Sequence, residues 1–316
     1  MNKLILSFFL LWPFTVTAQD SGNANSFITL GTIGGPMGEP SRSQPANALI
    51  NGKDIYLVDA GDGTAVQLAK AGIPLRGVQG VFLSHLHFDH TAGVLGVLGL
   101  RMQLNLNQPL HIYGPPGTQA FIDGLLAGMA PAMAAAYGFP GQTWSTDVQV
   151  TELVQGSKVQ LDNMAVTVAE NTHFSYPAES PEADSFKSLS FRFDLPDRSI
   201  VYTGDTGPSE ALTQLAGGAD LLVSEMFDLE KAMTRVQENS PNIPAPALSA
   251  IRRHFTEHHV SPQQVGEMAA AAEVSAVVIT HMVPSISTPE EEQYYIGEIH
   301  KFYEGEVLIA DDLDRF

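Results

Sequence analysis

The sequence predicts a single α/β domain. Apolar residues make up 44% of the 316 residues and charged residues 16%, a composition typical of a globular domain with a large core. The chain opens with antiparallel strands, and from Thr64 onward helical segments alternate with short apolar strands. Both halves follow a similar order of strands and helices, with no low-complexity linker between them. We therefore expect one domain over residues 19–316.

Strand and turn signals give the order of the predicted elements in the first half. A glycine-rich turn follows the first strand, and Asn51-Gly52 is typical of a hairpin turn between the second and third strands. Strands are predicted at residues 26–32, 46–50, 54–58, 78–83, 110–113, 148–154, 165–170 and 188–194. Helices are predicted at residues 64–71 and 92–104, and from residue 118 to near residue 137.

The second half continues the alternation. Strands are predicted at residues 199–203, 220–224 and 276–280, and helices at residues 210–215 and 262–272. Residues 239–246 contain three prolines, which indicates an ordered loop.

The first 18 residues are typical of an export signal. Lys3 precedes an apolar run over residues 4–16, and the small residues that follow favour cleavage after Ala18. The run is shorter than the roughly 20 residues of a bilayer span, and Pro13 interrupts it. An uncleaved membrane anchor is the alternative. We expect a periplasmic or secreted protein with no membrane attachment after signal cleavage.

Charge and cysteine content exclude several classes of function. Sixteen Lys and Arg oppose 35 Asp and Glu, a formal net charge of −19, which disfavours binding to a phosphate backbone. The chain has no cysteine, which excludes disulfides, a thiol nucleophile and a cysteine-based zinc site. A metal must therefore be bound by His, Asp or Glu, and ten histidines are present.

Four potential metal ligands lie within six residues, where the strand over 78–83 meets a helix start. His85 and His87 are two residues apart, so in an extended loop both can face one point. Asp89 and His90 come one bend later and can face a second point nearby. This spacing favours two metals in one cleft over one metal with four ligands.

Three further positions each place one ligand at the end of a predicted strand. They are His173, Asp205 and His281. Each alone is typical of a capping or satisfied polar residue, but together with the first cluster they complete a ligand set.

The run from Ser84 to His90, followed by these three lone ligands in that order, resembles the metallo-β-lactamase superfamily. The resemblance covers essentially the whole mature chain. It implies a four-layer αββα sandwich, with two mixed sheets in the middle and helices on the outer faces. It also implies two zinc ions, although His and Asp ligands leave manganese and iron open.

The same resemblance assigns roles to the ligands. It implies that His85, His87 and His173 bind the first metal, that Asp89, His90 and His281 bind the second, and that Asp205 bridges them. Two metals about 3.5–4 Å apart can hold a hydroxide between them at neutral pH, which would be the nucleophile. Asp59, at a strand end, is expected to orient a ligand histidine, with a turn cap as the alternative.

The branch of the superfamily is indicated by His258-His259-Val260-Ser261-Pro262, which resembles an element of the arylsulfatase, phosphodiesterase and ribonuclease Z-like branch. There a histidine faces the leaving group, and His259 matches that position better than His258. The candidate catalytic residues are therefore Asp89 and His259. An exposed histidine pair near a helix start is the alternative.

We expect a small-molecule substrate, either a sulfate ester or a phosphodiester, and no nucleic-acid partner. A lactonase, a β-lactamase and a non-catalytic metal-binding module are the alternatives. Residues 124–139, with Met129 and Met133, form either a lid over the substrate or ordinary core. A homodimer is left open.

Overall fold

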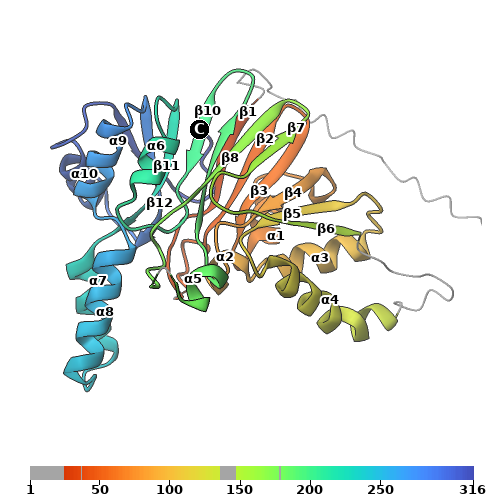
Figure 1. Cartoon of the computed structure of the whole chain (residues 1–316), viewed down its shortest axis with the longest axis horizontal. Helices are drawn as coiled ribbons and strands as arrows, with labels where there is room; N and C mark the ends of the chain where they lie inside the picture. The colour runs from red at the N-terminus through yellow and green to blue at the C-terminus, as the bar shows by residue number, and fades with distance from the viewer. Residues whose placement is uncertain (1–24, 37, 136–146, 178) are drawn as a thin grey trace, which may run out of the picture.

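The computed structural model describes residues 25–316 except 37, 136–146 and 178 (Figure 1). The predicted signal segment, residues 1–18, lies outside the described residues, so export stays a prediction. In the described part of the chain, no helix is both long and apolar enough to span a bilayer.

The first sheet has six strands, antiparallel at its start and parallel afterwards. In spatial order they are β1 (Asn25–Gly31), β2 (Ala46–Asn51), β3 (Asp54–Ala60), β4 (Val78–Phe82), β5 (Leu110–Gly114) and β6 (Val148–Glu152). The antiparallel opening and the strand leading to the histidine cluster are therefore as predicted.

The second sheet has seven strands and is also mixed. In spatial order they are β13 (Glu306–Ile309), β12 (Ala276–Val283), β11 (Leu221–Phe227), β10 (Ser199–Tyr202), β9 (Leu189–Asp194), β8 (Met164–Glu170) and β7 (Lys158–Leu161). Strands β10 to β13 pair in parallel, whereas β7 to β10 pair antiparallel. Strands β7 and β13 were not predicted, because both are only four residues long and partly exposed.

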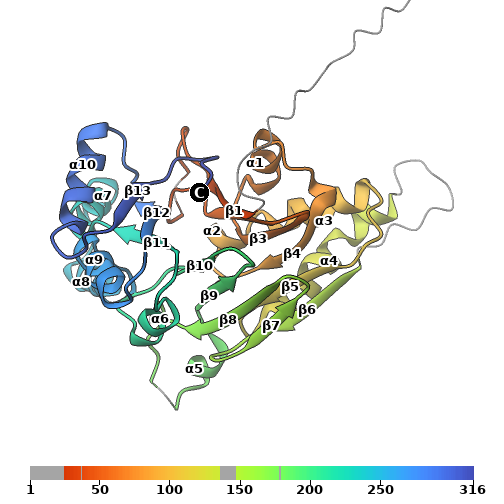
Figure 2. The same cartoon turned by 90° about the horizontal axis from the view of Figure 1, so that it is seen from above.

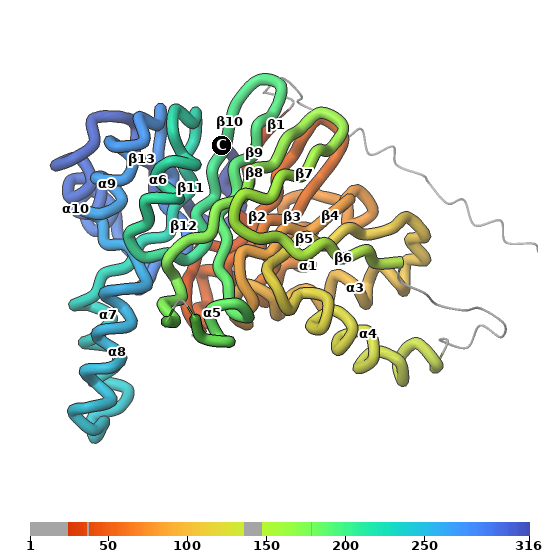
Figure 3. The backbone as a smooth tube through the Cα atoms, viewed as in Figure 1, coloured from red at the N-terminus to blue at the C-terminus, as the bar shows by residue number. Residues whose placement is uncertain are grey.

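Helices cover the outer face of each sheet (Figure 2). The first sheet is covered by α1 (Thr64–Lys70), α3 (Val94–Gln103) and α4 (Thr118–Ala134), and the second by α6 (Glu210–Leu215), α9 (Pro262–Ala271) and α10 (Pro289–Ile299). The remaining helices are η1 (Leu75–Gly77), α2 (Phe88–Thr91), α5 (Pro181–Ser185), α7 (Leu229–Asn239) and α8 (Ala245–His258). Figure 3 shows α7 and α8 projecting side by side from the body.

Three buried clusters of apolar side chains separate the four layers. Between the sheets, the Phe82 ring packs edge-on against Phe191 and Phe193, with centroids 5.6 and 5.3 Å away. The other two clusters join each sheet to its own helices. This arrangement confirms the predicted αββα sandwich, since each sheet buries both of its faces.

Two further predicted segments can be placed in the structure. The loop predicted over residues 239–246 is present between α7, which ends at Asn239, and α8, which begins at Ala245; the two helices on either side of it were not predicted. Pro244 at the N-cap and a Pro in the first turn start α8. In α4, Met129 is buried in the cluster between the helix and the first sheet, so this position belongs to the core. Residues 136–139 of the suggested lid lie outside the described residues.

Candidate metal centre

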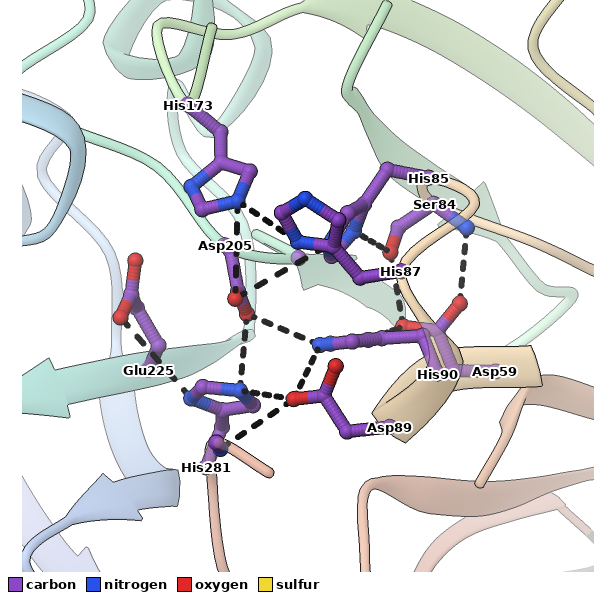
Figure 4. Close-up of polar contacts among 12 residues, drawn as sticks. Asp59, Ser84, His85, His87, Asp89, His90, His173, Asp205, Glu225 and His281 are labelled. Carbon is purple, nitrogen blue, oxygen red and sulfur yellow. Dashed lines mark hydrogen bonds and ion pairs between the residues drawn. The ribbon is translucent and has the colours of Figure 1, made fainter. Parts of the chain in front are cut away.

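The structure brings all seven predicted metal-binding side chains together at one end of the two sheets. Four come from the loop after β4 and from α2, which begins directly at Phe88. His173 and Asp205 lie in the loops after β8 and β10, and His281 lies within β12. Figure 4 shows their side chains converging from both sheets.

Three histidines form a first group of donor atoms. The Nδ1 atom of His87 lies 3.0 Å from Nε2 of His85 and 3.3 Å from Nε2 of His173. Two ligands of a tetrahedral zinc lie about 3.3–3.4 Å apart when each is about 2.0–2.1 Å from the ion. The three nitrogens are therefore spaced as ligands of one ion.

The second group is built around carboxylates. The Nε2 atoms of His90 and His281 both lie 3.6 Å from Oδ2 of Asp89. The same two nitrogens lie 3.2 and 3.1 Å from Oδ1 of Asp205. These four residues can also hold one ion.

Asp205 faces both groups with different oxygens. Its Oδ1 atom points to the second group, and its Oδ2 atom lies 3.9 Å from Nε2 of both His85 and His173. A carboxylate in this position is placed to bridge two ions.

Several donor atoms are buried without a hydrogen-bond partner. They include Nε2 of His90, Oδ1 of Asp205 and both ring nitrogens of His281. Such atoms cost free energy unless another group satisfies them. The residues present therefore fit a bound metal, because ions would satisfy these atoms in both groups.

Burial and charge set the protonation of the donors in the metal-free centre. Burial lowers the pKa of His85 well below its usual value and that of His173 to about 3, which leaves both rings neutral and able to bind a metal. Burial acts on His90 in the same direction, but the surrounding carboxylates, Asp205 first, raise its pKa well above the usual value. The second group therefore favours a positive charge, which a bound cation would supply.

Asp59 supports the second group from behind. Its Oδ2 atom lies 2.7 Å from Nδ1 of His90 and accepts hydrogen bonds from Tyr202 Oη and Ser84 Oγ, both at 2.8 Å. Its Oδ1 atom accepts from the Ser84 backbone N–H. The expected contact with a ligand histidine is present, and the same carboxylate also fixes the start of the histidine loop.

Strained backbone and a close contact fix two site residues. Among the described non-glycine residues, Asp59 and His281 are two of the few with positive φ, at 58° and 42°. The glycine-rich turn has a role here, since a Cβ atom on Gly34 would lie 2.3 Å from the His281 ring. This position therefore admits only glycine unless the ring moves.

Sequence reasoning missed Glu225. It is a fully buried carboxylate in β11, and its Oε2 atom lies 2.8 Å from Nδ1 of His259. Burial raises the pKa of Glu225 well above its usual value, with Asp205 adding to the effect, while burial lowers the pKa of His259. The pair is therefore placed to share one proton.

His259, and not His258, faces the cleft. Its ring stacks on Phe227 with a centroid distance of 4.7 Å and lies 5.0 Å from the His173 ring. His258 instead contacts Ser175 and His254 through its ring nitrogens and accepts from His173 through its backbone carbonyl. The cleft has a volume of about 400 Å³ and is lined by His259 together with members of both donor groups.

The fold and the centre thus define a class of protein: an αββα sandwich with side chains at one end that could hold metal ions. Residues 55–282 match a family model described as the beta-lactamase superfamily domain. A Ribonuclease Z from Mycobacterium sp. (strain KMS) is 30% identical, over 91% of this chain and 94% of that protein. A Ribonuclease Z from Mycobacterium marinum is 29% identical over 91% and 97%.

Solved structures show the same fold at lower identity. The metallo-beta-lactamase fold protein YhfI from Bacillus subtilis superposes with a TM-score of 0.65 at 18% identity, covering 92% of this chain and 98% of that one. The short form of human tRNase Z has a TM-score of 0.64 at 21% identity, with the same coverage. The chain belongs to the metallo-β-lactamase superfamily, in its ribonuclease Z-like branch, and it is a metal-dependent hydrolase.

The comparisons contradict two predictions made from the sequence. The expectations of a small-molecule substrate, either a sulfate ester or a phosphodiester, and of no nucleic-acid partner are both wrong, because relatives that match nine-tenths of the chain are named Ribonuclease Z. The lactonase, β-lactamase and non-catalytic alternatives fail for the same reason. The error arose because net charge describes the whole surface, whereas binding depends on the local field at the cleft.

Proposed function

We propose that this protein is a ribonuclease that uses two zinc ions to hydrolyse a phosphodiester bond in RNA. The observation that carries the proposal is the placement of Asp205, which faces both donor groups in the cleft that His259 also lines. The names of the relatives support RNA as the substrate. Manganese or iron would suit the same donors.

The ions would supply the central chemistry. Two zinc ions held in this way lower the pKa of water to about 7 and stabilise negative charge on a phosphate. We assign His85, His87 and His173 to one ion, and Asp89, His90 and His281 to the other, with Asp205 shared.

The chain's own side chains handle the protons. Asp89 is held by the Gly35 backbone N–H at 3.1 Å, and the neighbouring histidines lower its pKa despite its burial, which keeps the carboxylate ionised. In that form we assign it to accept a proton from the attacking water. The bond from phosphorus to the leaving oxygen then breaks, and that oxygen takes the proton on Nε2 of His259 while the proton of Glu225 moves to Nδ1 of the same ring. Glu225 orients the His259 ring through Nδ1 and leaves Nε2 for the substrate.

The charge of the cleft suits an anionic substrate better than the charge of the whole chain does. Asp89 and Asp205 are the two carboxylates among the residues lining the cleft, and both are assigned to metal. Two divalent ions would reverse the local field, so a phosphodiester can enter despite the net charge of −19.

The direct test is cleavage of RNA by the zinc-loaded protein. A transfer RNA transcript with a 3′ extension should be cut, with the product resolved on a denaturing gel. His259→Ala should lower kcat by about 10²–10⁴-fold, as expected for a lost general acid. Metal content by mass spectrometry should stay at the wild-type value.

A sulfur-substituted substrate separates the acid role from a structural one. When sulfur replaces the leaving oxygen, the leaving group needs little protonation, so His259→Ala should cleave it nearly as fast as the wild type. His258→Ala is the matched control and should cleave both substrates normally, because the His258 side chain does not line the cleft and its backbone carbonyl, which contacts His173, is kept. A zinc-loaded wild-type protein that cuts no RNA would refute the proposed function.

A further inference from the structure

We propose that Phe88, Tyr176 and Phe186 form a stacking surface on which unpaired bases of the RNA bind beside the metal cleft. The identity of the ligand rests on the proposed function. The surface itself is recognised from side-chain positions that the catalytic assignment does not use.

An exposed aromatic ring lines the cleft. In the part of the chain that the structure describes, five aromatic side chains are exposed, at Phe88, Tyr176, Phe186, Tyr294 and Phe302. Phe88 is 81% exposed, although it lies between two metal-binding positions and lines the cleft. An apolar ring left in water at the entrance of a site is typical of a binding surface.

A row of rings leads from the first donor group to the surface. The Phe174 ring lies 5.3 Å from the His87 ring and 4.9 Å from the His173 ring. Tyr176 lies 6.2 Å from Phe174, and Phe186 lies 5.6 Å from Tyr176. The row therefore begins at the metal-binding histidines and ends at rings that are 42% and 52% exposed.

The outermost ring, Phe186, directly follows a short helix, α5, at the same end of the sheets as α2 (Figure 1). The Ser180 hydroxyl caps α5 by accepting from the Ala183 backbone N–H. At the C-terminal end of the helix, the Phe186 backbone N–H donates to the Glu182 carbonyl. This capping sets the position of Phe186 beside Tyr176 without covering either ring.

The charges around the cleft make stacking the suitable means of recognition. No Lys or Arg is among the residues that line the cleft, so direct contacts from cationic side chains to phosphates are missing there. Bases can instead stack on aromatic rings, an interaction that does not need a basic surface. Three exposed rings beside the metals would bind a single-stranded segment next to the cleaved bond.

The test compares natural and abasic RNA on ring variants. The probe is the labelled product of transfer RNA cleavage, with its unpaired 3′ nucleotides either natural or abasic, and Kd is measured by fluorescence anisotropy on the zinc-loaded protein. The wild type should bind natural RNA about tenfold more tightly than abasic RNA, a difference within the range that the stacking of one base contributes to affinity. Tyr176→Leu, Phe186→Leu and Phe88→Leu should each reduce that ratio towards one.

Tyr294→Leu is the matched control, because its ring is 56% exposed on α10, away from the cleft residues. It should keep the tenfold ratio. Equal binding of natural and abasic RNA by a wild type that cleaves RNA would overturn the stacking surface and leave the function standing. Base-dependent binding without cleavage would support the stacking surface and overturn the ribonuclease function. No RNA binding at all would overturn both proposals.

Discussion

The two donor groups of the metal centre differ in what surrounds them. The first consists of three histidines, one of which, His87, is exposed, and its supports are neutral: the Ser84 hydroxyl beside His85 and the His258 carbonyl beside His173. The second contains carboxylates and is supported by a further buried carboxylate, Asp59. Carboxylates behind a ligand make it more basic and fix its orientation, so we infer that the second group holds its metal more tightly.

Removing the residue that both groups share should have the largest effect. Asp205→Asn replaces the one side chain that faces both groups, so activity on RNA should fall by more than the roughly 100-fold that a supporting residue contributes. Metal content by mass spectrometry should drop below two ions per chain. If the Asp205→Asn variant retained two ions and full activity, the carboxylate would not be a bridge between the metals.

Removing one histidine from each group tests the inferred difference in affinity directly. His87→Ala should leave the tighter second group intact, so calorimetric titration should show one ion bound with near wild-type affinity. His90→Ala should leave only the weaker first group, and the remaining ion should dissociate at lower chelator concentration. Equal affinities in the two variants would contradict the difference between the groups.

The candidate metal ligands could be found in the sequence because each lies where the local sequence carries a signal. The run from Ser84 to His90 puts four donors after an apolar strand, and His173 and Asp205 each follow a predicted strand. The carboxyl ends of parallel strands meet at one edge of a sheet. Strands β8 and β10 both lie antiparallel to β9 between them, so they run the same way and bring His173 and Asp205 to the same edge. The four-layer arrangement followed from the family resemblance and not from periodicity.

Glu225 could not be found from the sequence in this way. It lies inside an apolar strand, where a lone carboxylate carries no spacing signal, and its partners Thr206 and His259 are 19 and 34 residues away. A charged residue in an otherwise buried strand was the one available indication. The substrate was mispredicted for a related reason, since charges summed over the chain do not report which side chains line the cleft.

Replacing Asp59, which lies behind the second donor group, should have the smallest effect of the three changes. The result also shows whether Asp59 acts through its charge or by fixing the Ser84 backbone. Asp59→Asn keeps the shape but removes the charge behind His90, so affinity at the second group should fall by about 10–100-fold while the first group is unchanged. Tyr202→Phe is the matched control, because it removes a hydrogen bond to the same Oδ2 atom and leaves the carboxylate in place. If the charge on Asp59 is what strengthens the second group, Tyr202→Phe should change metal affinity far less than Asp59→Asn. If Asp59 instead acts only by fixing the Ser84 backbone, Asp59→Asn should lower the metal affinity of both groups together. His85 of the first group and His90 of the second lie in the same segment, which begins at Ser84.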